Sequence, residues 1–154
     1  MLEMNQMMTA LEIGFEEALG DSSSLDGRLA DILDGGFEEI SGCIVLSVFA
    51  EDALRAAGSA FDETGLEAFV NHIHVEDVLP DAAPTDVRRQ AACLVGRLRE
   101  ELHRAYPALT FVVIVAVGDS TTVRFHRDRP GQSWLAADLE SYDAEAILRL
   151  RTSG

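Results

Sequence analysis

Hydrophobic residues recur at helical spacing near the start of the chain. The spacings are three and four residues, which places these side chains on one face of a helix. The residues are Met4, Met8, Leu11, Phe15 and Leu19. A serine run follows, in which Ser24 is placed to cap a second, short helix, and two glycines, Gly35 and Gly36, would end that helix. The sequence therefore predicts two helices in its first quarter.

Residues 43–49 are apolar at nearly every position, within a segment, 37–50, that is rich in strand-forming side chains. An unbroken apolar run of this kind is typical of a strand covered on both faces, so we expect a central strand there. Residues 51–69 follow with short helical fragments broken by Gly58 and Gly65. These fragments predict one or two short helices.

Residues 70–80 alternate between apolar and polar side chains. Ile73 and Val75 share one side, as they would in a strand with one solvated face or at a sheet edge. Farther on, Thr85 is placed to cap the strongest helical pattern of the chain, which runs to Tyr106. The apolar face of this long helix consists of Val87, Ala91, Leu94, Leu98, Leu102 and Ala105.

The C-terminal third has the pattern of a β-meander. Residues 109–117 and 121–127 read as two strands joined by a tight turn, and residues 146–152 alternate as a closing strand. Residues 134–142 between them predict a short helix. The element order favours an α+β fold in one domain, 1–154, with a mainly antiparallel sheet of about four to five strands, helices packed on one face and a C-terminal β-hairpin or meander.

The net charge of −15 lies in one half of the chain. Residues 1–80 hold 17 Asp or Glu against two arginines, whereas residues 81–154 hold ten acids and ten arginines. Such asymmetry attracts basic partners. It also disfavours nucleic-acid binding through a basic face, because that mode needs cations to neutralise phosphates. With 154 residues, 47% of them hydrophobic, the chain is long enough to bury one core.

Cys43 and Cys93 lie in apolar contexts without metal-binding spacing. We expect buried free thiols in a reducing compartment, with a single disulfide as the alternative. The N-terminal residues are acidic and have no small-residue cleavage site, so we expect no secretory signal. No apolar run is long enough to span a bilayer, so we expect a cytoplasmic protein that does not engage a membrane.

One candidate metal site is the group His72, His74 and Glu76, which a strand over residues 70–80 would project from one face. Two imidazoles and a carboxylate are suitable ligands for zinc or non-haem iron. The alternation of an amphipathic strand explains the same pattern without a metal. We favour that simpler interpretation and keep a Zn or Fe site as the alternative.

Cations, an imidazole and an indole come close in sequence only around residues 124–134. The residues are Arg124, His126, Arg127, Arg129 and Trp134. Bidentate arginines bind carboxylates or phosphates, and an indole stacks on a base or a guanidinium. The alternative, which we favour, is a turn that Trp134 anchors to the core. If the chain has a small-ligand site, we expect it here.

Acidic residues of the first half are the candidate surface for a basic partner. We select Glu51, Asp52, Asp62, Glu63 and Glu67 as its binding residues. The same surface would include Glu12, Glu16, Glu17, Asp31, Asp34, Glu38 and Glu39. Carboxylates of this kind speed association with a cationic protein, although solubility alone also explains an acidic composition.

The sequence holds no nucleophile elbow, phosphate-binding loop, dinucleotide fingerprint or zinc-protease motif. We therefore expect a small protein-binding module without a cofactor, such as an inhibitor or immunity-type protein that neutralises a basic partner. One alternative is a ligand- or metal-dependent small enzyme at either candidate site. Another is a homo-oligomeric accessory protein, a homodimer joined through the Met-rich N-terminal helix.

Overall fold

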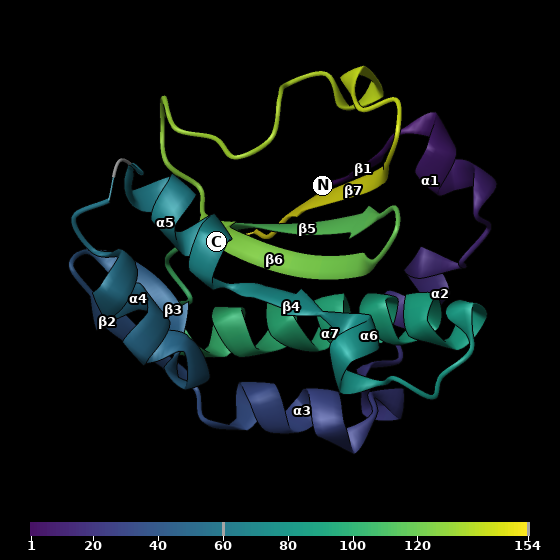
Figure 1. Cartoon of the computed structure of the whole chain (residues 1–154), viewed down its shortest axis with the longest axis horizontal. Helices are drawn as coiled ribbons and strands as arrows, with labels where there is room; N and C mark the ends of the chain where they lie inside the picture. Colours follow the sequence, from purple (N-terminus) through teal and green to yellow (C-terminus); the bar gives the residue numbers. More distant parts are fainter. Residues whose placement is uncertain (60, 154) are drawn as a thin grey trace.

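A five-stranded antiparallel sheet forms the centre of the molecule in the computed structural model, which describes residues 1–59 and 61–153 (Figure 1). The strand order is β1-β7-β5-β6-β4. In that order the strands span Leu2–Met4, Ala146–Arg151, Phe111–Val117, Thr121–Arg127 and His72–His74. A separate two-stranded sheet consists of β2, Phe37–Ile40, and β3, Cys43–Leu46. The predicted α+β class and C-terminal meander are therefore confirmed.

Helices occupy most of the first two thirds of the chain. The α-helices are α1, Gln6–Ala10; α2, Phe15–Leu19; α3, Gly27–Asp34; α4, Ala50–Ala56; α5, Glu63–Val70; α6, Val75–Val78; and α7, Pro84–Ala105. Three short 3₁₀ turns are η1, Ser22–Ser24; η2, Ser47–Phe49; and η3, Leu139–Ser141. No described helix is both long and apolar enough to cross a membrane.

The long helix α7 packs along one face of the main sheet, with α3 beyond it (Figure 1). The alternation of β6 sends Val123 and Phe125 toward this helix, as predicted, and both are almost fully buried. They share a core with Leu94 and Leu98, which lie one turn apart on α7. The apolar face of the strand packs against the apolar face of the helix, and both faces are thereby removed from water.

The opposite face of the sheet is covered by an irregular segment, residues 128–145, which arches over it (Figure 1). Leu135 and Leu139 of this segment pack against Ile114 and Ile147 in a second apolar cluster. The helix expected over residues 134–142 is reduced to the single turn η3. This face of the sheet is therefore covered by a loop with apolar side chains, where a helix was expected.

The N-terminal segment is not one helix. Leu2–Met4 pairs with β7, and Asn5 then caps α1 through its side chain. The Asn5 Oδ1 atom accepts the backbone N–H groups of Met8 and Ile147, each at 3.0 Å. Gly14, at φ +69°, separates α1 from α2. The predicted helix is therefore present in part, as α1 and α2. The buried cap Asn5 and the left-handed Gly14 set where these helices begin.

Two helices also begin at other residues than predicted. The carboxylate of Asp26, not Ser24, caps α3 and accepts a backbone N–H of its first turn. Helix α7 begins with Pro84 rather than after a cap at Thr85. Proline suits the first helical position because it has no N–H that would need a partner there.

Strand β3 is buried at all four positions, but it is not the central strand that its apolar run predicted. Among the described strands it pairs only with β2. Its other edge is completed by one side chain from α5 and one from the residue that follows α5. The Glu67 carboxylate accepts the Ile44 N–H at 2.6 Å. The Asn71 amide accepts the Leu46 N–H at 3.0 Å and donates to the Ile44 carbonyl at 2.9 Å. Side chains therefore satisfy backbone groups that a neighbouring strand would otherwise bind.

Strand β4 is an edge strand, which was one of the two predicted possibilities, but it ends at His74. Val75 begins α6, so the strand expected over residues 70–80 is much shorter. Ile73 and Val75 are both buried. The alternation of apolar and polar residues therefore extends beyond the end of the strand.

Both cysteines are free and buried, as expected. Cys43 packs in the small apolar cluster between β3 and α5, and Cys93 in the main core. Burial raises the pKa of the Cys43 thiol to about 11, and the charge of Glu67 adds to that shift. Such a thiol stays protonated at neutral pH and is a poor nucleophile.

Candidate functional site

Glu67, which was expected on the acidic surface, is completely buried. Its Oε1 accepts Arg129 Nη1 at 2.6 Å and the Arg127 N–H at 2.9 Å. Its Oε2 accepts Arg129 Nη2 at 3.0 Å in addition to the β3 N–H. A carboxylate with these partners is fully satisfied inside the protein and cannot contact another molecule. The prediction that Glu67 binds a partner at the surface is therefore wrong.

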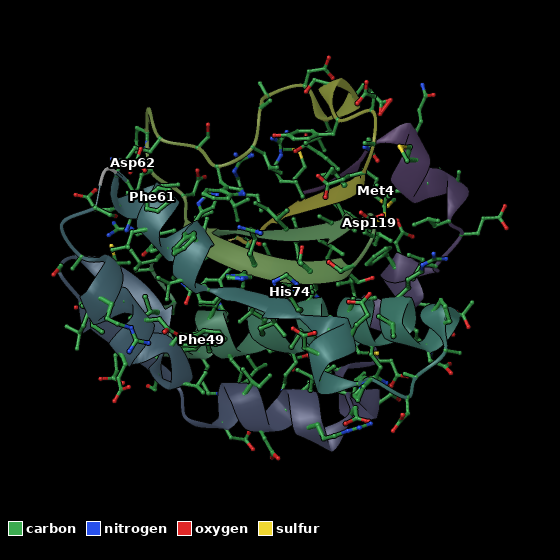
Figure 2. All side chains as sticks on the ribbon, viewed as in Figure 1. Met4, Phe49, Phe61, Asp62, His74 and Asp119 are labelled. Carbon is green, nitrogen blue, oxygen red and sulfur yellow. The ribbon has the colours of Figure 1, made fainter. Side chains whose placement is uncertain are left out.

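Two exposed phenylalanines lie at either end of α5. Phe61 is 44% exposed and Phe69 47%, and their rings stack with centroids 5.1 Å apart. The Trp134 ring lies 6.4 Å from Phe61, and the His72 ring lies 6.3 Å from Phe69. Figure 2 shows Phe61 at the rim of the molecule beside the start of α5. We call these four rings together with Arg124 the aromatic cluster.

Arg124 joins the two ends of this cluster. Its Cζ lies 4.8 Å from the centre of the Trp134 ring, and its Nη1 donates to the Ala68 carbonyl at 3.0 Å. His72 sits opposite Arg124 in the pairing of β4 with β6. Arg124 forms no ion pair with any described residue. Burial lowers the pKa of Arg124, although the group stays charged at neutral pH.

The structure thus brings Arg124 and Trp134 together as the sequence suggested. Trp134 also packs against the second apolar cluster, which holds Leu135 and Ile147. The indole therefore both anchors the covering segment and receives the guanidinium on its face.

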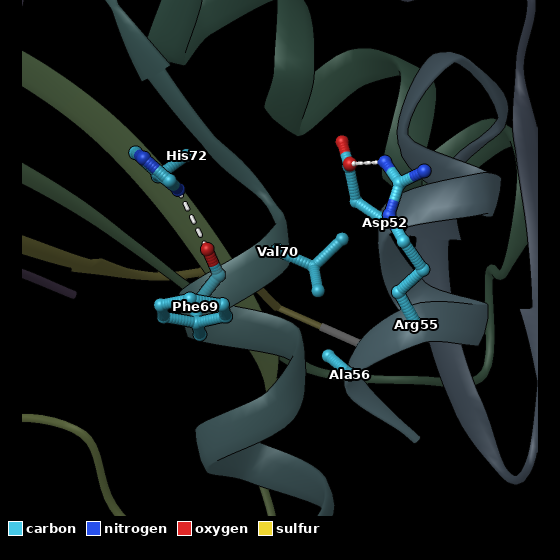
Figure 3. A pocket seen from close by; sticks show the side chains of 6 residues that line it. All are labelled: Asp52, Arg55, Ala56, Phe69, Val70 and His72. Carbon is cyan, nitrogen blue, oxygen red and sulfur yellow. Dashed lines mark hydrogen bonds and ion pairs between the residues drawn. The ribbon is translucent and has the colours of Figure 1, made fainter. Parts of the chain in front are cut away.

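A hollow of about 470 Å³ opens beside the cluster, between α4 and the end of α5 (Figure 3). It is lined by Asp52, Arg55, Ala56, Phe69, Val70 and His72. Asp52 and Arg55 form an exposed ion pair at its edge. We call this cavity the α4–α5 hollow. Its apolar wall and polar edge suit a side chain that is itself apolar along its stem and charged at its tip.

The two helices on either side of the hollow carry exposed acidic side chains. Glu51 and Asp52 lie on α4, and Asp62 and Glu63 begin α5; all four are exposed. Asp62 also caps α5 through its carboxylate. The only arginine in the sequence from β2 through α5 is Arg55. We call the four carboxylates the acidic rim, and their field favours a cation.

Elsewhere the fold joins the two halves of the chain by ion pairs. Arg149 binds Glu3 at 2.7 Å, and Arg89 binds Asp21 at 3.4 Å. These contacts reduce the charge asymmetry that the sequence showed. The acidic rim keeps most of the asymmetry. Within the described residues, its one ion pair with an arginine of the second half joins Glu63 to Arg129, at 3.9 Å.

His126 and Arg127, predicted at the same site as Trp134, do not reach the cluster's surface. His126 is only 3% exposed and lies beneath the covering segment, at a cavity of about 50 Å³ that Trp134 also lines. Its Nδ1 contacts the Arg127 carbonyl oxygen at 2.9 Å. Burial lowers the pKa of His126. Arg127 contributes its backbone N–H to Glu67.

The three residues of the candidate metal site separate in the structure. His72 and His74 stay together on β4, with ring centroids 4.9 Å apart. Glu76 lies in α6, where both carboxylate oxygens accept the Thr121 N–H, at 2.7 and 2.8 Å. Within residues 1–59 and 61–153 there is no group of three or more His, Cys, Asp or Glu that could hold a metal ion.

Of the N-terminal methionines, Met8 is buried, whereas Met1, Met4 and Met7 are exposed. They lie on separate short elements instead of the single helix that was expected to form a dimer interface. A homodimer through this region stays a prediction.

Sequence reasoning missed Phe61 and Phe69, because an aromatic residue is expected in the core by default. The sequence held no clear signal for their exposure. Phe69 follows Leu66 by three residues, a spacing that predicts a shared buried face. In the structure Leu66 is buried and Phe69 is exposed.

A protein-family model described as "Uncharacterized protein PM0498 family" matches residues 3–153. No curated protein and no solved structure matches the chain. The matched region includes the aromatic cluster, the α4–α5 hollow and the acidic rim.

Proposed function

The chain belongs to the PM0498 family, and we propose that it is a protein-binding module that docks a basic partner on the aromatic cluster and the acidic rim. In this role it would act as an inhibitor or immunity-type protein that neutralises its partner by covering it. The observation that carries the proposal is the exposed stack of Phe61 on Phe69, next to two helices that carry four exposed carboxylates.

Exposed aromatic rings are costly unless another surface covers them, because each keeps a large apolar area in water. Phe61, Phe69 and Trp134 form a contiguous group with Arg124. Aromatic residues and arginine are the types that dominate the binding energy of protein interfaces. The aromatic cluster therefore supports a docking centre more than a solubilising surface.

The acidic rim supports a basic partner in particular. A lysine or arginine entering the α4–α5 hollow would lay its stem against Phe69 and Val70 and its charge near Asp52. The face of Phe69 adds a cation–π contribution. Glu51 and Glu63 act at longer range, where they speed the encounter with a cationic surface.

The test is affinity capture from the organism's own extract, followed by kinetics with the captured protein. Glu51→Arg/Glu63→Arg should slow association by about tenfold at low salt, and added salt should remove the difference. Phe69→Ala should speed dissociation by about tenfold, because it removes a central contact. Both variants keep the core, since the replaced side chains are exposed.

The matched control is Asp31→Arg/Asp34→Arg. It changes the net charge by the same amount on α3, which lies beyond α7 from the sheet. If both double variants slow association equally, the effect of the rim is non-specific charge attraction, and the proposed docking surface is not supported. Binding that is indifferent to Phe69→Ala and to the rim reversal would overturn it.

A further inference from the structure

We propose that His72 and His74 form a two-histidine site for a divalent transition-metal ion at the open edge of the main sheet. The proposal does not depend on the docking of a basic partner. It differs from the three-residue site suggested by the sequence, because Glu76 is excluded from it.

The backbone of β4 places both imidazoles on one side of the sheet. His72 and His74 are two residues apart on a strand, and Ile73 between them points into the core with 4% exposure. Successive side chains of a strand point to opposite faces, so the two histidines share the outer face. Their ring centroids are 4.9 Å apart and the ring planes are nearly perpendicular, at 82°. Figure 2 shows His74 on this strand.

The hydrogen bond of His72 leaves one ring nitrogen available. His72 Nδ1 lies 2.6 Å from the Phe69 carbonyl oxygen (Figure 3). A carbonyl oxygen only accepts, so Nδ1 carries a proton, and in the neutral imidazole Nε2 then keeps its lone pair. Histidines that bind metals commonly donate their other ring N–H to a backbone carbonyl, which fixes the ring and its tautomer. The Phe69 carbonyl supplies that support here.

The pair lies at the surface of the protein, where His74 is exposed and His72 is partly buried. Among the described strands, β4 pairs only with β6 and stands at the end of the sheet. Arg124, the nearest cation in the strand pairing, is engaged by the Trp134 ring and the Ala68 carbonyl. Water would fill the remaining coordination positions.

The donor set determines which ions fit. Imidazole nitrogen suits Cu²⁺, Ni²⁺ and Zn²⁺, whereas Mg²⁺ and Ca²⁺ prefer oxygen ligands. A non-haem iron centre needs a carboxylate beside two histidines, and the carboxylate of Glu76 is bound to the Thr121 N–H. The geometry therefore points to copper, nickel or zinc.

The experiment is calorimetric titration of the chain, prepared without a polyhistidine tag, with Ni²⁺ and with Zn²⁺. Nuclear magnetic resonance with Ni²⁺ then identifies the imidazoles that broaden. We expect one ion per chain, broadening of His72 and His74, and affinity at least about tenfold weaker in His74→Ala. His74 is exposed, so this variant keeps the fold.

The control is His103→Ala, which removes another exposed imidazole, from the last turn of α7, and should bind as the unmodified chain does. Mg²⁺ should produce no binding. The proposal is overturned if the unmodified chain binds neither ion, if His74→Ala retains full affinity, or if His103→Ala loses it.

Discussion

Arg129 binds the buried carboxylate of Glu67, 62 residues earlier in the chain, through both terminal nitrogens of its guanidinium, at 2.6 and 3.0 Å. The same carboxylate accepts backbone N–H groups from β3 and from the end of β6. One ion pair therefore joins the two sheets, α5 and the start of the covering segment. It also holds α5 in the position from which Phe61 and Phe69 reach the surface.

Removal of one partner of this pair should destabilise the fold strongly. Arg129→Ala leaves the Glu67 carboxylate buried without its counter-charge, which costs about 3–5 kcal/mol. The measurement is the free energy of unfolding in urea. Arg55→Ala, which breaks the exposed pair with Asp52, should cost less than about 1 kcal/mol. Equal losses in the two variants would contradict the assigned role of Arg129.

Asn71 should also contribute to the stability of the fold, although by less than Arg129. Its amide binds the Leu46 N–H and the Ile44 carbonyl, and Asn71→Ala leaves both backbone groups buried without these partners. We expect a loss of about 2 kcal/mol in the free energy of unfolding. Hydrogen exchange at the Leu46 amide should accelerate more than exchange in β5. Unchanged protection at Leu46 would show that another group replaces the side chain.

Gly96 should tolerate no side chain. A Cβ atom there would lie 2.4 Å from the carbonyl oxygen of Leu19, where α2 crosses α7. Gly96→Ala must therefore separate the two helices, at a cost of about 1–3 kcal/mol. Gly27→Ala meets no atom within 4 Å and should be close to neutral. Thermal unfolding of the two variants tests the difference, and a neutral Gly96→Ala would contradict the close approach.

The stability of the protein should fall at mildly acidic pH because of His126. Burial lowers the pKa of this imidazole in the folded state, whereas the unfolded chain titrates near pH 6.5. The unfolded state therefore takes up the proton first. The contribution of the neutral His126 to the free energy of unfolding is therefore fully present above about pH 6.5. It is lost as the pH falls below that value.

His126→Gln removes this titration and should flatten the dependence of the unfolding free energy on pH below about pH 6.5. Urea unfolding at several pH values measures the slope. His103→Gln, which replaces an exposed imidazole, should leave the slope unchanged. A slope that is the same in His126→Gln and in the unmodified chain would assign the acid sensitivity to other groups.

Part of the candidate site could be predicted from the sequence. Arg124 and Trp134 were selected because they lie close along the chain, and the structure brings them into contact. Phe61 and Phe69 were not selected, because their exposure depends on how α5 docks against β3 and β6. Glu67 was selected wrongly, since its charge is satisfied by a residue that no local pattern connects to it.

The sequence by itself determined the local elements. The periods of α7 and of the meander predicted the long helix, the hairpin of β5 and β6, and the inward positions of Val123 and Phe125. These features depend on neighbours within a few residues, and a hydrophobic period reports that kind of burial directly.

The tertiary structure decided which polar groups are buried and which apolar groups are exposed. His126 has the alternation of a solvated position, yet residues 128–145 cover it. Strand β3 has the composition of a central strand, yet side chains of Glu67 and Asn71 complete its edge. In each case the partner lies far away along the chain. Hydrophobic periodicity reports only on neighbours within a few residues. Contacts between distant segments depend on how the elements pack, so periodicity does not predict them.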